Sequence, residues 1–192
     1  MAYEINPENY REDYLSCLYD YASMLKKPCR IVEIGCYEGQ STIMMAAAIS
    51  GSESGLYTID PILKSGKALI PDALKPDGHL REIIPERVLE RFRLFGETIH
   101  PIPEYSWDAI QTWRLPIDLL FVDGEHTREA VTQDLEWMAF VRAGGYAAFD
   151  DWIDPIERTV MDYIDKYKGW RVLHESTDPL DGIMSITLFQ RN

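Results

Sequence analysis

Hydrophobic positions along the chain fall into two patterns, short apolar runs and longer segments with apolar residues at helical spacing. The short runs predict five strands, at Arg30–Ile34, Gly55–Ile59, Arg93–Phe95, Asp118–Val122 and Gly145–Phe149. The segments between most of them predict helices at Ser41–Ile49, Pro85–Phe92, Trp107–Trp113 and Thr127–Val141. Because strands and helices alternate, the pattern indicates parallel strands joined by crossover helices.

The two ends of the chain add further elements. Asn6-Pro7 offers a helix N-cap and a first-turn proline, and helical spacing continues to Lys26-Lys27-Pro28, which predicts an amphipathic helix within residues 1–28. The C-terminal part predicts a helix, two strands and the turn between these strands, at Pro155–Tyr167, Trp170–His174, Ile183–Phe189 and Asp178–Gly182. We therefore expect an α/β, Rossmann-like fold, with a seven-stranded, mostly parallel sheet, helices on both faces and an antiparallel C-terminal strand.

The length and the spacing of these elements indicate a single domain over residues 1–192. Residues 61–84 stand apart, because they show no clear periodicity and are long for a connection. Such a segment is typically a lid or a substrate-binding element, or else disordered.

Charge narrows the classes of partner. The net charge of −13 and the pI of about 4.7 disfavour nucleic acid and anionic membrane surfaces as partners. Since no apolar leader follows Met1 and the run Ile43–Ile49 is too short for a bilayer, a cytoplasmic protein is expected. The three cysteines suggest neither disulfides nor a zinc site, and a homo-oligomer is left open.

The segment from Arg30 to Thr42 carries the strongest local signal. The first strand ends in a turn with Gly35 and Gly39, where missing Cβ atoms let a ligand approach the backbone. The spacing Gly-x-x-x-Gly differs from the Gly-x-Gly-x-x-Gly of pyrophosphate sites, so we expect a nucleotide cofactor without a pyrophosphate. The further candidates for lining this loop are Cys36, Tyr37, Gln40 and Ser41, the last being also an ordinary first-turn helix residue.

Two acids accompany the glycine loop. Glu33 is expected to face the same crevice as an acceptor, and the alternative is a strand residue paired with a lysine. Asp60 ends the second strand 25 residues after Gly35, where an acid can accept hydrogen bonds from both ribose hydroxyls. The alternative for Asp60 is an Asp-Pro turn with Pro61.

Three more carboxylates follow the fourth and fifth predicted strands. Asp123 ends one strand and Asp150 and Asp151 end the next, so all three should emerge at the same edge of a parallel sheet. Clustered carboxylates repel unless a cation compensates, and oxygen ligands suit Mg²⁺ or another hard divalent ion. The alternative is that Asp123 contacts the cofactor while Asp150 and Asp151 cap the following turn.

Three segments of the second half carry a family resemblance: Phe121–His126, Asp134–Trp137 and Arg142–Trp152. With the glycine loop before them, they resemble class I S-adenosylmethionine-dependent methyltransferases over roughly Cys29–Trp152, in a small-molecule branch with macrocin-type sugar O-methyltransferases and, more distantly, catechol O-methyltransferase. The resemblance implies S-adenosylmethionine as cofactor. It also implies adenine contacts at Gly96-Glu97-Thr98, for which a simple turn is the alternative, and a divalent ion at Asp123, Asp150 and Asp151.

The chemistry that fits is methyl transfer to a hydroxyl group, with Asp123 and His126 as catalytic candidates. An ordinary histidine pKa suits proton removal near neutrality, and His126 follows Asp123 by three residues at the opening of a helix. An orienting, cofactor-contacting or surface histidine is the alternative. Two other functions stay open at this point, a Rossmann-type NAD oxidoreductase and a non-catalytic cofactor-binding protein of the same fold.

Overall fold

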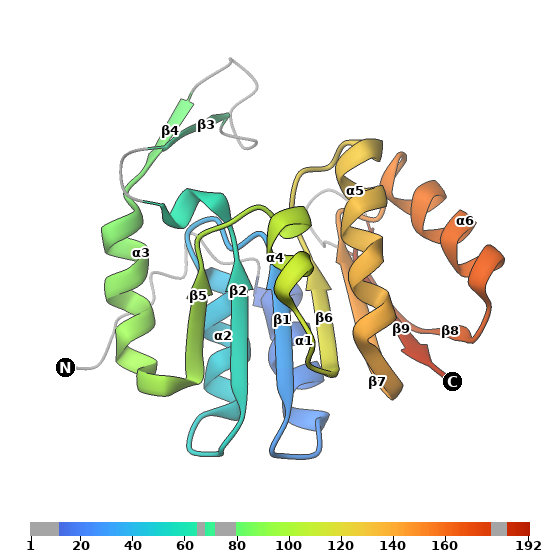
Figure 1. The fold of residues 1–192 in the computed structure, drawn as a ribbon, viewed down its shortest axis with the longest axis horizontal. Coiled ribbons are helices and arrows are strands. Elements are labelled where there is room, and N and C mark those ends of the chain that lie inside the picture. The colour runs from blue at the N-terminus through green and yellow to red at the C-terminus, as the bar shows by residue number, and fades with distance from the viewer. Residues whose placement is uncertain (1–11, 65–67, 72–79, 178–183) are drawn as a thin grey trace.

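The computed structural model describes residues 12–64, 68–71, 80–177 and 184–192, which form a central sheet with helices on both faces (Figure 1). Within these ranges, the main sheet has seven strands in the order β5-β2-β1-β6-β7-β9-β8. Their bounds are Arg30–Ile34 for β1, Gly55–Ile59 for β2, Ile99–Ile102 for β5, Ile117–Val122 for β6, Val141–Asp150 for β7, Trp170–Thr177 for β8 and Met184–Arg191 for β9. The first five pair in parallel, and β9 runs antiparallel to both β7 and β8. The predicted fold class is confirmed.

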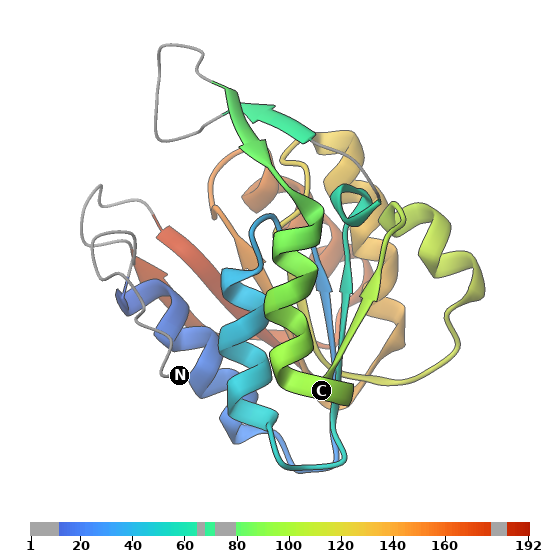
Figure 2. The ribbon, with the colours of Figure 1, turned by 90° about the vertical axis from the view of Figure 1, so that its left-hand side faces the viewer.

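Helices α1, α2 and α3 lie on one side of the sheet and α4 and α5 on the other (Figure 2). The helices are α1 Glu12–Met24, α2 Gln40–Ile49, α3 Pro85–Phe92, α4 Ser106–Thr112, α5 Arg128–Asp134 and α6 Ile156–Tyr167, with 3-10 helices η2 Pro61–Leu63, η3 Arg93–Thr98 and η4 Leu135–Phe140. In the described ranges, each helix is too short or too polar to cross a membrane.

Strand alternation divides the core between the two faces of the sheet. In β1, Ile31 packs with α1, α2 and α3, whereas Val32 and Ile34 pack with α4, α5 and α6. Both groups are almost completely buried, which is typical of parallel strands covered by helices on both sides. Glu33 therefore shares the face of Ile31.

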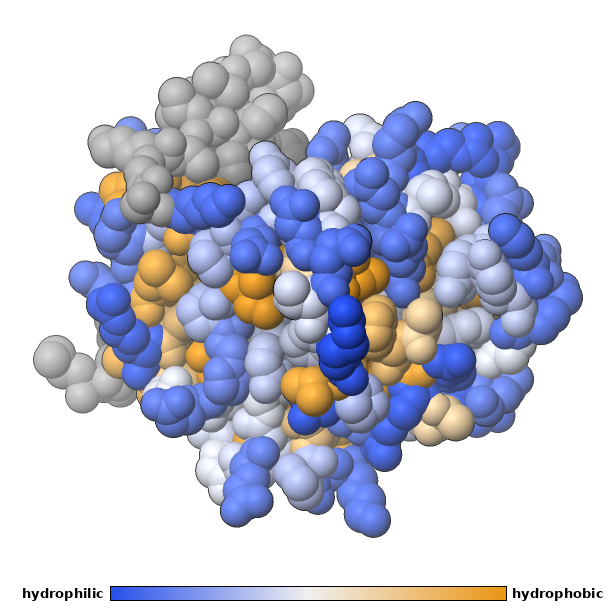
Figure 3. All heavy atoms as spheres, in the orientation of Figure 1, coloured by the Kyte–Doolittle hydropathy of each residue, from blue (hydrophilic) through white to orange (hydrophobic). Residues whose placement is uncertain are grey.

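The surface in the view of Figure 1 is mainly hydrophilic, with small separate groups of hydrophobic side chains (Figure 3). Exposed Leu94, Ile153 and Tyr167 come from different elements. Scattered apolar side chains of this kind are ordinary for a folded domain.

The predicted third strand at Arg93–Phe95 is wrong. These residues belong to η3, and the strand lies at Ile99–Ile102, six residues later. Pro101 is unusual in a strand, because proline has no backbone N–H to donate to the hydrogen bonds between strands. Among the described strands β5 lies at the edge of the sheet and pairs with β2 alone, so Pro101 is tolerated.

Two other segments differ from the prediction. The helix expected over Thr127–Val141 ends at Asp134, continues as η4, and gives way to β7 at Val141. Within residues 61–84, strands β3 (Ala68–Pro71) and β4 (Leu80–Ile83) form a small antiparallel sheet that projects above the edge where β1, β2 and β6 end (Figure 1). The lid prediction for the rest of this segment, and the turn at Asp178–Gly182, lie outside the described residues.

Candidate functional site

The candidate site lies where the strand order reverses direction along the chain, between β1 and β6. Ile34 at the end of β1 pairs with Ile59 in β2 and with Val122 in β6. The residues that follow these three, Gly35, Asp60 and Asp123, therefore emerge side by side at one edge of the sheet. In open α/β sheets this switch point is the usual place for a ligand.

Gly35 is required by the close approach of two loops. Its φ is +83°, and a Cβ atom there would lie 2.0 Å from the Asp123 carbonyl oxygen and 2.9 Å from Gly124 Cα. The Gly35 amide donates to Ile59 O at 2.9 Å and the Asp123 amide to Ile34 O at 2.8 Å. Any side chain at Gly35 would thus push Asp123 away from β1.

Asp60 fixes the glycine loop to the end of β2. Its Oδ2 accepts hydrogen bonds from the amides of Cys36 and Tyr37 at 2.9 and 3.0 Å, and its Oδ1 accepts one from Ile62 at 2.9 Å. The turn expected at Asp60-Pro61 is present as the start of η2. Oδ2 already accepts two hydrogen bonds and Oδ1 accepts one, so a lone pair of Oδ1 is left for the predicted contact with ribose.

The glycine loop itself is tightly built. Tyr37 has a φ of +49°, a strained value for a residue other than glycine, and Gly39 has a φ of +80° at the N-cap of α2. A Cβ at Gly39 would meet the Phe92 ring at 2.5 Å. Cys36 is buried, which raises the pKa of its thiol, and Gln40 is the first residue of α2.

Glu33 does not face the crevice in this structure. It is fully buried, and its carboxylate accepts hydrogen bonds from Ser41 Oγ at 2.5 Å, Thr42 Oγ1 at 2.5 Å and Thr58 Oγ1 at 2.7 Å. Burial raises the pKa of Glu33 to about 7 against the opposing effect of these hydroxyls. Among the described residues, its hydrogen-bond partners are thus hydroxyl groups and not a lysine, and Glu33 acts on the loop through the first turn of α2.

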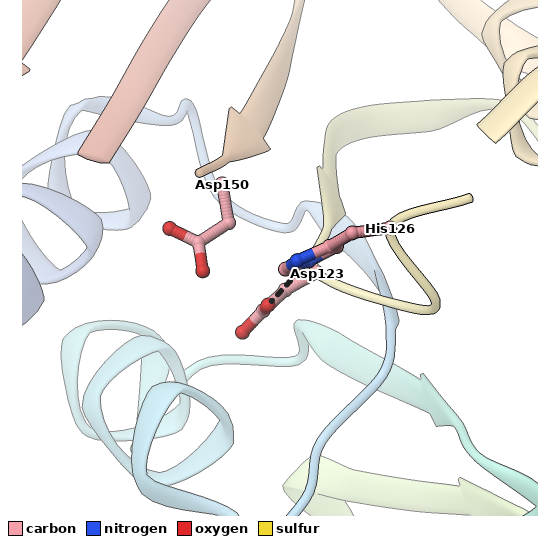
Figure 4. Close-up of side chains that lie close together, drawn as sticks. All are labelled: Asp123, His126 and Asp150. Carbon is pink, nitrogen blue, oxygen red and sulfur yellow. Dashed lines mark ion pairs between the residues drawn. The ribbon is translucent and has the colours of Figure 1, made fainter. Parts of the chain in front are cut away.

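Asp123, His126 and Asp150 lie close together at the ends of β6 and β7 (Figure 4). One ligand atom from each of the three lies within 4.8 Å of the others. His126 Nε2 is 3.5 Å from Asp123 Oδ1, and its Nδ1 is 3.1 Å from Asp151 Oδ2. The imidazole therefore sits between two carboxylates, and Asp151, the third predicted metal ligand, lies on its far side.

These carboxylates change the protonation expected for His126. The bonds to Asp123 and Asp151 raise the pKa of His126 to about 10, so without a cation the ring keeps its proton at neutral pH. Burial raises the pKa of Asp123, although His126 and Asp150 lower it. The sequence analysis assumed an ordinary pKa for His126, and this assumption is wrong. Asp151 is distant in the sequence, and only the folded chain brings its carboxylate to the imidazole.

Residues 32–152 match the model of a protein family described as a methyltransferase domain, which covers more than half of the chain. The chain belongs to this methyltransferase family. The match closely follows the Cys29–Trp152 resemblance predicted from the sequence, and it decides against the oxidoreductase alternative.

Three known proteins illustrate what this methyltransferase domain is similar to. An uncharacterized protein of Acanthamoeba polyphaga mimivirus is 30% identical over 129 residues, which cover 64% of this chain and 51% of that protein. The chain thus spans about half the length of this relative. The structure of the O-methyltransferase NovP has a TM-score of 0.71 at 19% identity, covering 93% of this chain and 79% of NovP. The O-methyltransferase from Bacillus cereus in complex with SAH has a TM-score of 0.64 at 16% identity, covering 100% of this chain and 84% of that one.

The predicted adenine contacts at Glu97 and Thr98 need correction. Both residues precede β5, so they lie at the amino edge of the sheet, where they help to line a cavity of about 410 Å³ with Arg30, Gly55 and His100. The error follows from the misplaced third strand. At the carboxyl edge of β5, Ile102 O accepts a hydrogen bond from the Asp60 amide at 3.1 Å, so the residues after Ile102 adjoin Asp60 in this methyltransferase domain.

Sequence reasoning missed the hydroxyl partners of Glu33. Thr58 stands opposite Glu33 in the parallel register of β1 and β2, two strands of equal length that were both predicted correctly. That register was the signal that could have placed Thr58 beside Glu33. Thr42 lies on the buried side of α2 and carried no separate signal.

Proposed function

We propose that the chain is an S-adenosylmethionine-dependent methyltransferase that methylates a hydroxyl group of a small molecule, such as a sugar, with the help of a divalent cation. The observation that carries the proposal is the convergence of Asp123, His126 and Asp150 beside Gly35 and Asp60, at the switch point of the sheet. Membership of the methyltransferase family supports methyl transfer, and similarity to O-methyltransferases, one of them in complex with SAH, supports the cofactor and the oxygen acceptor.

The cofactor is proposed to lie along the glycine loop. The methionine part would lie along the backbone turn that holds Gly35 and Gly39, and Asp60 would accept a hydrogen bond from the ribose. Cys36, Tyr37, Gln40 and Ser41 are the loop positions proposed to line this space, and Asp123 closes it from β6. Since Glu97 and Thr98 lie at the opposite edge, residues 103–105 take their place as candidates for the adenine end.

Asp123 and Asp150 are the proposed main cation ligands, with Asp151 as the third candidate. Their chemistry fits a divalent ion, because two hydrogen-bonded carboxyl groups need a proton or a cation between them. Oxygen ligands of this kind favour Mg²⁺. When bound, the cation would lower the pKa of an acceptor hydroxyl and orient it.

His126 is proposed to take the proton of the acceptor hydroxyl at Nε2. Asp151 holds Nδ1, which leaves Nε2 directed toward Asp123 and the site. A cation bound to Asp123 would weaken one of the two carboxylate contacts that raise the pKa of His126 to about 10, and the lower pKa would suit a base. The strained φ of +46° at Asp151 fits a residue that is held in place for this contact.

The acceptor is proposed to be small and uncharged or cationic. A net charge of −13 opposes nucleic acid and anionic membrane partners. A cytoplasmic location and the possibility of a homo-oligomer remain expectations from the sequence.

The deciding experiment combines binding with turnover. Calorimetry should show preferential binding of S-adenosylhomocysteine over NAD, and a panel of sugars and catechols should be methylated with Mg²⁺ and much less in EDTA. D150N should weaken Mg²⁺ binding more than about tenfold, while D162N, which removes an equal but exposed charge on α6, should not.

Each contrary result has a distinct meaning. Preferential binding of NAD would overturn the proposal as a whole. Equal turnover in EDTA would remove the cation from the mechanism, and cofactor binding without transfer to any acceptor would favour a non-catalytic member of the family.

A further inference from the structure

Asp134 is a buried acid for which the proposed chemistry has no use. It is the last residue of α5, only 3% exposed, and it opens the Asp134–Trp137 segment that contributed to the family resemblance. A buried carboxylate is unfavourable unless neighbouring groups stabilise it. Its partners therefore indicate its role.

Asp134 is held from one side by the start of α4. Ser106 Oγ donates a short hydrogen bond to Asp134 Oδ1, and Trp137 Nε1 donates to the Ser106 carbonyl at 3.3 Å. Both bonds are buried. Buried hydrogen bonds restrict side-chain movement, so Ser106 fixes one oxygen of the Asp134 carboxylate.

The other oxygen of Asp134 lies against the loop that carries Asp123 and His126. A Cβ at Gly124 would be 3.2 Å from Asp134 Oδ2 and 3.4 Å from Ile34 Cγ2. A Cβ at Gly124 would therefore be crowded, and Asp134 or the loop would have to shift by a few tenths of an ångström to admit it. The contact falls one residue after Asp123 and two before His126.

The loop is thus fixed at three points. Asp123 N is bonded to Ile34 O at 2.8 Å, and Thr127 caps α5 by accepting a hydrogen bond from the Ala130 amide at 3.3 Å. Helix α5 then leads to Asp134, which returns to contact Gly124. The side chain of His126 is held by Asp123 and Asp151, and the approach of Asp134 adds a restraint on the loop backbone at Gly124.

We propose that Asp134 is a positioning residue that fixes the loop from Asp123 to Thr127 against α4, and thereby sets the placement of His126 and Asp123. The inference rests on the function proposed above for those two residues. Asp134 itself touches neither reacting group. A misplacement of about 1 Å in a catalytic group can cost about 100-fold in rate, so a distant residue of this kind affects turnover.

Two substitutions disturb the same contact in different ways. D134N changes the charge of the oxygen that faces Gly124, and G124A inserts a methyl group into the contact without changing any charge. D118N is the matched control, because Asp118 is also buried, at 8% exposed, but binds Arg30 and Arg142 at the amino end of β6.

The readouts are amide hydrogen exchange and steady-state kinetics. D134N and G124A should each speed exchange of the amides of residues 124–127 by about tenfold and lower kcat by about tenfold to 100-fold. The KM for S-adenosylmethionine and the Kd of S-adenosylhomocysteine should stay within about twofold. The double variant should lose little more than the worse single one, because both act on one contact. D118N should lower the Tm and leave kcat and loop exchange unchanged.

A purely structural role predicts a different outcome. In that case D134N would lower the Tm, raise exchange evenly over the domain and leave kcat unchanged below the unfolding transition, and the inference would be overturned. Should D134N fail to fold, G124A alone decides by the same measurements. If the wild type neither binds S-adenosylhomocysteine nor transfers methyl groups, the proposed function fails, and local exchange alone then supports or overturns the contact between Asp134 and the loop.

Discussion

Glu33 shows how burial and hydrogen bonding compete at a single side chain. Three hydroxyl groups donate to its carboxylate, yet complete burial raises its pKa to about 7. In the unfolded chain the pKa returns to about 4.5. The folded state therefore binds more protons than the unfolded state between these values, and the contribution of Glu33 to stability is lost as the pH rises through this window.

E33Q should remove this pH dependence, because glutamine cannot ionise. The free energy of unfolding of the wild type relative to E33Q should fall by on the order of 3 kcal/mol between pH 5 and pH 8. Urea unfolding at both pH values measures this difference. E53Q, at an exposed glutamate, controls for loss of one negative charge and should change stability by less than about 0.5 kcal/mol at either pH. A difference between wild type and E33Q that is equal at pH 5 and pH 8 would contradict the assignment.

Single residues of the site differ in how far the sequence could predict them. Asp123, Asp150 and Asp60 follow strands, so knowledge of a parallel sheet was enough to place them at one edge. The pKa of His126 depends on Asp151, which is 25 positions away and approaches through the backbone conformation of one strained residue. Such a contact leaves no periodic trace in the sequence.

At the scale of elements, the turn from β1 into α2 combines two demands on the backbone. Gly35, Tyr37 and Gly39 all adopt positive φ values, and Asp60 holds the amides between them. Gly51, in the turn after α2, has a similar φ of +75°, but a Cβ there would meet no atom within 4 Å. A comparison of Gly35 with Gly51 therefore distinguishes the cost of a positive φ from the cost of steric crowding.

G35A should be far more harmful than G51A. Both alanines pay for a positive φ, at about 1–2 kcal/mol, but only G35A also forces the Asp123 backbone away from β1. We expect G35A to lower the free energy of unfolding by about 3 kcal/mol more than G51A and to abolish detectable binding of S-adenosylhomocysteine. Urea unfolding and calorimetry test this pair. Equal losses of stability with intact binding in G35A would show that the close approach is unimportant.

The strand prediction failed where the position of a segment in the sheet mattered more than its local sequence. His-Pro in Ile99–Ile102 is a poor strand sequence that only an edge position tolerates, and the more apolar Arg93–Phe95 was favoured instead. A displacement of six residues moved Glu97 and Thr98 from one edge of the sheet to the other. Strands in the middle of the sheet, such as β1 and β2, have mostly apolar sequences and were predicted with correct bounds.

At the scale of the whole molecule, the sheet separates two hydrophobic clusters that report differently on unfolding. All five tryptophans belong to the side covered by α4, α5 and α6: Trp113, Trp137 and Trp152 in its core, Trp170 against it and Trp107 on α4. The cluster beneath α1, α2 and α3 contains none of them. Tryptophan fluorescence thus monitors one face of the sheet, whereas far-UV circular dichroism follows both.

M45A should reveal whether the two faces unfold together. Met45 is fully buried in the tryptophan-free cluster, so its truncation should cost about 2–5 kcal/mol. If residues 1–192 form a single cooperative domain, the urea midpoint of tryptophan fluorescence must fall by as much as the midpoint of circular dichroism, although no tryptophan contacts the mutated cluster. M161A, at a methionine that is 37% exposed on α6, should shift neither midpoint by more than the equivalent of about 0.5 kcal/mol. If the fluorescence midpoint of M45A stays at its wild-type value, the two hydrophobic clusters unfold independently although they share the strands of the sheet. The single-domain prediction would then be wrong.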